Sequence, residues 1–190
     1  MRNLGLLSIG LLMMQAGLCA APTAYRITVD THEFNGSRGS LHFQFNPGNP
    51  ATQPLEARIV DFTGGAPASS QSVQGNVSGT LPHTVTMANR GALNEYFEPF
   101  RFGESFSFVL VLEGAAIDSP DRAVNSGSLF CLALYKDEAG TVPIPATDAL
   151  GCNLAMHIAR GSISMSTPSG PLKVTVTPTR MPSSGGRSER

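Results

Sequence analysis

The sequence has no tryptophan and few charged residues, and both shortages narrow the range of functions. Of its 190 residues only 14% are charged, and the formal net charge is −1. A chain so close to neutral has no strong positive field, so we expect no nucleic acid partner. With no tryptophan and three tyrosines, it also has few residues for the aromatic platforms that many sugar-binding faces use.

The motifs of several common enzyme classes are also missing. There is no GxSxG turn to present a nucleophilic serine, no phosphate-binding P-loop and no dinucleotide fingerprint. The four histidines have none of the spacings, such as HxH or HExxH, that hold a metal ion. These histidines are His32, His42, His83 and His157. We therefore expect no catalytic residues and no cofactor, and ordinary surface exposure for His42.

Only one long apolar run is present, and it lies at the start of the chain. Arg2 precedes the run Leu4 to Met14, and small residues follow it through Ala21. These are the parts of a secretory signal peptide, and the run is too short to span a membrane. We expect a signal peptide over residues 1–21, one domain over 22–177 and a disordered tail over 178–190. The mature chain would then be secreted or periplasmic, with no transmembrane segment.

Alternation of apolar and polar residues dominates the rest of the chain and predicts β-strands. The clearest case is Ser105 to Leu112, where Phe106, Phe108, Leu110 and Leu112 share one face. Val109 and Val111 make the other face apolar too, which is typical of a central strand. Further strands are expected over 25–30, 40–45, 128–135, 154–159, 163–165 and 172–176. The strand 56–62 is ambiguous, with either Ile59 or the Val60 and Phe62 pair facing inward.

Short strands separated by turn residues at nearly regular intervals indicate an all-β fold. We predict an antiparallel β-sandwich of jelly-roll type. One short helix is expected over Asn89 to Phe97, because Asn89 can cap it and Leu93, Tyr96 and Phe97 fall on one helical face.

Four phrases of the sequence resemble one protein family. They are YRITVDT (25–31), LHFQFNPG (41–48), VSGTLP (77–82) and FRFGESFSFVLVLEG (100–114). In this order they are similar to a functionally uncharacterised family of exported bacterial proteins, many of which carry a PEP-CTERM sorting signal. The resemblance implies a fold lineage and an exported protein, and it supplies no active-site residues. The Pro-Glu-Pro motif and apolar segment of that signal are absent after Val176.

Two cysteines remain once the signal peptide is removed, and we predict that they form a disulfide. Cys131 lies in an expected strand and Cys152 in the loop before the next strand. An exported protein meets an oxidising compartment, where such a pair closes. The alternative is two unrelated thiols, with Cys131 a small core residue.

Two sets of oxygen-bearing side chains are candidates for chemistry. Asp118, Asp121 and Asn125 in one loop are candidates for a calcium site. Glycoside hydrolysis needs two carboxylates that face each other across a cleft. The available residues are Glu95, Glu98, Glu104 and Glu113.

These observations favour an exported, non-catalytic domain that acts by binding or assembly at the cell surface or in the extracellular matrix. Its partners would be an extracellular polysaccharide or surface proteins. The alternative is a carbohydrate-binding module or an extracellular polysaccharide hydrolase.

Overall fold

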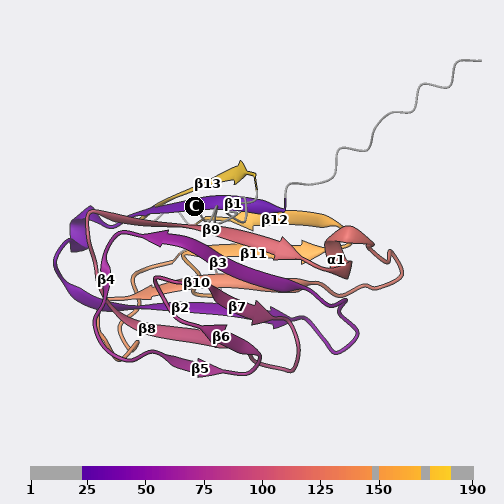
Figure 1. Ribbon diagram of the computed structural model, residues 1–190, viewed down its shortest axis with the longest axis horizontal. Helices are drawn as coiled ribbons and strands as arrows, with labels where there is room; N and C mark the ends of the chain where they lie inside the picture. The colour runs from indigo at the N-terminus through magenta and orange to yellow at the C-terminus, as the bar shows by residue number, and fades with distance from the viewer. Residues whose placement is uncertain (1–22, 147–149, 168–171, 181–190) are drawn as a thin grey trace, which may run out of the picture.

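The computed structural model describes residues 23–146, 150–167 and 172–180. The expected signal peptide and residues 181–190 of the expected tail lie outside these ranges. Within the described part, antiparallel strands form two sheets, and the fold is the all-β sandwich predicted from the alternation (Figure 1).

Sheet A has the strand order β13-β1-β9-β3-β7-β6, and neighbouring strands are hydrogen-bonded to one another. Its strands are β1 (Ala24–Asp30), β3 (Glu56–Thr63), β6 (Val77–Gly79), β7 (Val85–Ala88), β9 (Ser105–Glu113) and β13 (Lys173–Thr179). Sheet B has the order β12-β11-β10-β2-β8-β4, and β5 also pairs with β8. Its strands are β2 (Arg38–Pro47), β4 (Ala66–Pro67), β5 (Ser72–Gln74), β8 (Glu95–Arg101), β10 (Ser128–Tyr135), β11 (Leu154–Ala159) and β12 (Ser162–Ser166).

The first nine strands are connected as a jelly roll. The chain crosses between the sheets after most strands, except that β4 is followed by β5 in sheet B and β6 by β7 in sheet A. As a result β1, β9, β3 and β7 lie side by side in one sheet, while β2, β8 and the short β4 and β5 adjoin in the other. The remaining strands widen this framework. β10 to β12 continue sheet B beyond β2, and β13 continues sheet A beyond β1.

Strand β9 lies near the centre of sheet A, as its sequence predicts. Phe106, Phe108, Leu110 and Leu112 face the space between the sheets and are at most 1% exposed. Phe43 of β2 meets Phe108 edge to face, with ring centroids 5.4 Å apart. Val109 and Val111, on the opposite side of β9, are also buried. The strand is therefore covered on both faces.

A bulge in β3 resolves the ambiguity of that strand. Asp61 has a positive φ of 52°, and the pairing with β9 shifts register between Val60 and Thr63. The extra residue changes the phase of the alternation. Ile59 before the bulge and Phe62 after it are consequently both buried in the core.

The helix predicted over Asn89 to Phe97 is wrong. Glu95–Arg101 is strand β8, and its pairing with β2 places Tyr96 inward and Phe97 outward. The helical spacing of Leu93, Tyr96 and Phe97 was coincidental, because Leu93 is 37% exposed and Tyr96 is fully buried. In the described part, the single α-helix is the short α1 (Ala115–Asp118), in a segment expected to be a loop.

The C-terminal boundary of the domain differs from the expected one. Strand β13 continues through Pro178 to Thr179, so the domain extends two residues past the expected limit at 177.

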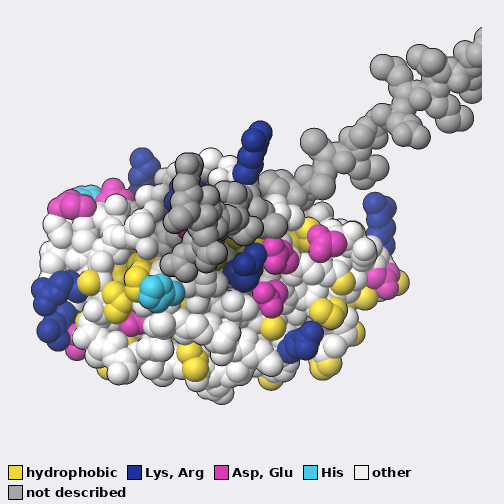
Figure 2. All heavy atoms as spheres, viewed as in Figure 1, with side chains coloured by type: hydrophobic (Ala, Val, Ile, Leu, Met, Phe, Trp, Pro, Cys, Tyr) yellow, Lys and Arg dark blue, Asp and Glu magenta, His cyan; other side chains and the backbone are white. Residues whose placement is uncertain are grey.

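Within the described residues, none of the helices is long and apolar enough to cross a membrane. On the side of the molecule in Figure 2, charged side chains are scattered over a surface that is mostly uncharged.

Candidate functional site

The outer side of sheet B carries polar and aromatic residues where β2 runs between β8 and β10. On β2 and β8 the side chains alternate between the core and this outer side. Five outward residues gather here, and we call them the sheet-B face: His42, Gln44, Glu95, Phe97 and Tyr135. None of them is freely exposed, because all five have intermediate burial.

His42 and Glu95 form the polar centre of the sheet-B face. His42 Nε2 lies 3.0 Å from Glu95 Oε2. Their side chains are 15% and 27% exposed, so the pair is more sheltered than an ordinary surface ion pair. His42 points outward, as its position in the strand predicts. The expectation of ordinary surface exposure is wrong, because neighbouring side chains cover most of the ring.

Gln44 lies beside the same imidazole nitrogen. Its Nε2 is 3.4 Å from His42 Nε2, farther than the carboxylate of Glu95. One ring nitrogen either donates a hydrogen bond or accepts one. If His42 Nε2 donates to Glu95, the Gln44 amide keeps its own hydrogen-bonding capacity for another molecule. The face thus combines an amide, an imidazole and a carboxylate.

Two aromatic rings flank the imidazole. The Phe97 ring centroid is 5.8 Å from that of His42 in an edge-on arrangement, and the Tyr135 centroid is 6.3 Å away. Burial, and next the negative charge of Glu95, raise the pKa of the Tyr135 phenol. Tyr135 therefore remains a neutral hydrogen-bonding group at physiological pH.

A loop packs against one side of the face. Gly140, in the connection after β10, lies so close to Phe97 that an added Cβ would approach a ring carbon to 2.7 Å. Asp137 holds this loop together by accepting hydrogen bonds from the N–H groups of Thr141 and Val142. The Asp137 carbonyl accepts a hydrogen bond from Ser40 of β2. The loop is therefore fixed to the sheet beside Phe97.

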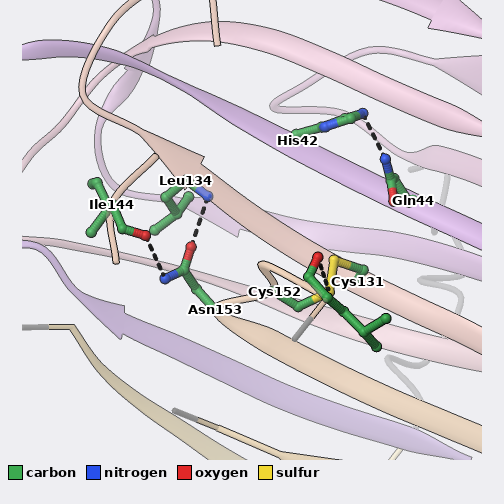
Figure 3. The surroundings of a disulfide bond; sticks show 8 residues. His42, Gln44, Cys131, Leu134, Ile144, Cys152 and Asn153 are labelled. Atoms are coloured by element: carbon green, nitrogen blue, oxygen red, sulfur yellow. Dashed lines mark hydrogen bonds between the residues drawn. A yellow bond between two sulfur atoms is a disulfide. The ribbon is translucent and has the colours of Figure 1, made fainter. Parts of the chain in front are cut away.

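A disulfide lies on the other side of the face (Figure 3). The structure joins Cys131 and Cys152, the pair predicted from the sequence, with their Cα atoms 5.5 Å apart. Cys131 stands opposite Gln44 in the pairing of β10 with β2. Nearby, Asn153 accepts a hydrogen bond from the N–H of Leu134 and donates to the carbonyl of Ile144. These contacts tie the β10–β11 connection to the sheet.

The four candidate glutamates do not face one another. Glu95 lies on the sheet-B face, whereas Glu98, three residues later, points into the core and is 1% exposed. Tyr96 donates a hydrogen bond to the Glu98 carboxyl and accepts one from the N–H of Leu81. Burial raises the pKa of Glu98 above its ordinary value, and the hydrogen bond from Tyr96 partly opposes this rise. Burial and the contact with Glu98 raise the pKa of Tyr96 to about 12.

The other two glutamates occupy separate parts of sheet A and its turns. Glu104, in the turn between β8 and β9, accepts a hydrogen bond from Asn35. Glu113, at the end of β9, pairs with Arg58 at 2.9 Å. The four residues have four different surroundings, so they supply no carboxylate pair across a cleft.

The calcium candidates are engaged in local turns. Asp118 accepts a hydrogen bond from the N–H of Gly114, and Asp121 accepts one from Ala123. Asn125 is exposed. Over residues 23–146, 150–167 and 172–180, no group of three or more His, Cys, Asp or Glu side chains is placed to hold a metal ion. Calcium binding at this loop stays a prediction.

A second charged cluster lies in a shallow hollow of about 420 Å³ beside β1 and β13, which includes Lys173 and Glu104. His32 Nδ1 is 2.7 Å from Asp30 Oδ1. This hydrogen bond lowers the pKa of Asp30 and raises that of His32. Both side chains are about half exposed, at 45% and 60%. Solvent therefore screens the pair, and it is typical of a surface contact.

The fold and these groups together define an all-β jelly-roll domain with a candidate ligand-binding face on sheet B. Comparison with protein-family models, with curated proteins and with solved structures found no match. The assignment of function therefore depends on the residues themselves. Sequence reasoning missed the contact of His42 with Glu95, because it arises from the pairing of two strands that are far apart in the chain.

Proposed function

We propose that this chain is an exported, non-catalytic domain that binds an extracellular polysaccharide at the cell surface or in the extracellular matrix. The observation that carries the proposal is the sheet-B face, where His42, Gln44 and Glu95 lie between two aromatic rings. The signal peptide over residues 1–21, a secreted or periplasmic location and kinship with the PEP-CTERM-associated family are parts of the same proposal.

The chemistry of the face suits a hydroxyl-rich ligand. The amide and the imidazole both donate hydrogen bonds to sugar hydroxyls and accept them, and the carboxylate accepts them. The rings of Phe97 and Tyr135 supply apolar surface for the carbon-bound face of a sugar ring. Because the outer side of a sheet is extended, it fits a linear polymer better than a small compact molecule.

Binding explains the arrangement better than hydrolysis does. Cleavage of a glycosidic bond needs an acid and a second carboxylate about 5 to 10 Å apart across the bond. On the sheet-B face the one carboxylate is Glu95, and its partner is an imidazole. A surface-protein ligand is the competing class, and the experiment below separates the two.

The test measures affinity for a panel of soluble polysaccharides by affinity electrophoresis, together with release of reducing sugar. We expect at least one glycan to slow the protein, with no reducing sugar released. Gln44→Ala should weaken binding about tenfold, since it removes a hydrogen-bonding group from the face. His157→Ala is the matched control, because His157 is an exposed histidine on β11 that lies outside the sheet-B face.

Three results would refute parts of this proposal. Retardation by no glycan would exclude the polysaccharide ligand and favour a surface protein. Equal losses in Gln44→Ala and His157→Ala would remove the binding role from the sheet-B face. Turnover that is abolished by Glu95→Gln would show that the protein is an enzyme. The intact mass of the exported protein separately tests whether residues 1–21 are removed.

A further inference from the structure

We propose that the cavity at one end of the sandwich, between the β2–β3 and β7–β8 loops, binds the carboxylate of an acidic sugar. Its volume is about 620 Å³, within the usual range of ligand pockets. Segments 47–54 and 89–92 line it. The cavity is separate from the sheet-B face, since none of the five residues of that face lines it.

The cavity is held open by a buried asparagine. Asn89 is 5% exposed, and its side chain ties the segment 53–55 to Ser128 at the start of β10. Its Oδ1 accepts a hydrogen bond from the N–H of Leu55, and its Nδ2 donates to the carbonyl of Gln53 and to Ser128 Oγ. The loops on either side are therefore fixed before a ligand arrives, which lowers the cost of ordering them on binding.

The exposed segment after Asn89 carries hydrogen-bond donors that no described group accepts from. The Arg90 guanidinium makes no ion pair or hydrogen bond with any described residue. The N–H groups of Gly91 and Ala92 likewise donate to no described group. Gly91 has a positive φ of 74°, a conformation that occurs where consecutive N–H groups form anion-binding concavities. A cation and two free amides thus adjoin one another in this segment.

The charge of the lining selects an anion. Among the described residues that line the cavity, Arg90 is the one charged side chain, and no aspartate or glutamate opposes it. A guanidinium binds a carboxylate through two parallel hydrogen bonds, a geometry that favours planar anions.

The rest of the lining indicates what carries the carboxylate. Pro47, Pro50 and Pro54 give apolar walls, while Asn49 and Thr52 add polar groups between them. Such a mixed lining fits a ring with both carbon-bound and hydroxyl-bearing sides. The choice of an anion stands on the cavity alone, whereas the choice of a sugar rests on the proposed function. A uronic acid residue satisfies both requirements, because it is a sugar ring that carries a carboxylate.

The test is calorimetric titration of the purified protein with trigalacturonic acid, with its methyl ester and with sodium phosphate. We expect the free acid to bind, and we expect the affinity for the methyl ester to be lower by a factor of about ten or more. Esterification removes the charge that Arg90 recognises. Arg90→Ala should lose the same factor, and Arg90→Lys should recover part of it. Phosphate should bind more weakly than the trisaccharide.

The control is Arg122→Ala, which removes another exposed arginine without an ion pair, in the loop after α1 and outside the cavity lining. This variant should bind as the parent protein does. Equal losses in Arg90→Ala and Arg122→Ala would show general attraction and overturn the site. Full affinity in Arg90→Ala, or no binding of the free acid, would also overturn it. Phosphate affinity equal to that of the trisaccharide would overturn the sugar assignment.

His42→Ala separates this inference from the proposed function. Retention of trigalacturonate binding in that variant supports a site distinct from the sheet-B face. Loss of binding in His42→Ala alone would place the ligand on the sheet-B face and refute the cavity. Neutral glycans that bind while trigalacturonate does not would refute the cavity and leave the proposed function standing.

Discussion

Removal of the disulfide tests the stability of the widened half of sheet B. Cys131 and Cys152 are separated by 21 residues, and the bond between them restricts the unfolded chain. For a loop of this length the chain-entropy estimate of the stabilisation is about 3 kcal/mol. For a domain of this size each kcal/mol shifts Tm by roughly 2 to 4 °C. We therefore expect the Cys131→Ala/Cys152→Ala variant to melt roughly 6 to 12 °C below the oxidised protein.

The native structure should survive this change, because other bonds hold the same connection. Lys136 donates a backbone hydrogen bond to Val142 at 2.8 Å, and Ile144 donates one to Leu134 at 2.8 Å. Asn153 adds a backbone hydrogen bond to Leu132 at 2.7 Å. The loss should thus come mainly from a less restricted unfolded state. The far-UV circular dichroism spectrum at 20 °C should be unchanged.

The assay is thermal unfolding followed by circular dichroism, with and without a phosphine reductant. The reductant should lower the Tm of the parent protein to that of the double variant and leave the variant unaffected. A double variant that melts within about 2 °C of the oxidised protein would refute the loop-closure argument. Two free thiols in the mass spectrum of the non-reduced protein would refute the disulfide itself.

The remaining predictions concern buried polar groups. Burial raises the folded-state pKa of Glu98. The stability that its neutral form contributes is therefore fully present below the unfolded pKa of about 4.3. That contribution is lost as pH rises through the higher folded-state pKa. The Tm of Glu98→Gln minus that of the parent should therefore increase from pH 4 to pH 8, and a difference independent of pH would contradict this reasoning. Asn89→Ala should cost about 3 kcal/mol in denaturant unfolding, because it leaves two buried partners, Leu55 N–H and Ser128 Oγ, and the half-buried carbonyl of Gln53 unsatisfied. The exposed Asn125→Ala should change stability by less than about 0.5 kcal/mol, and equal costs in the two variants would be inconsistent with the role of Asn89.

The strands with a continuous apolar inward face could be predicted from the sequence, whereas a polar residue at an inward position hid β8. On β9 every second residue from Phe106 to Leu112 is apolar, and Val109 and Val111 add an apolar outer face, so its residues, its inward face and its central place were all predicted correctly. β8 was not recognised, because Glu98 occupies an inward position where the pattern requires an apolar residue. Phe97 adds to the confusion, since it is an aromatic residue that faces outward. A carboxyl in the core depends on Tyr96, and such a partner is not visible in a hydrophobicity pattern.

The candidate sites were predicted less completely than the fold. The outward direction of His42 followed from its place in the strand, but its contact with Glu95 requires the pairing of β2 with β8. The cavity requires two loops, 47–54 and 89–92, to meet at one end of the sandwich. No local signal in either loop indicates the other. Sequence spacing therefore suggested which residue types were available and left their neighbours unknown.

The jelly-roll connection also has a consequence for how the protein acquires its structure. β1 is the first strand to be synthesised, and its partner β9 comes late, with Tyr25 placed opposite Leu110. Until that partner is available, the apolar side of β1 stays exposed and its backbone groups stay unpaired. Chains dominated by such distant pairings fold slowly and are prone to aggregate in the meantime. A ribosome-bound chain that ends before β9 therefore cannot complete sheet A, and it should depend on a chaperone to stay unaggregated.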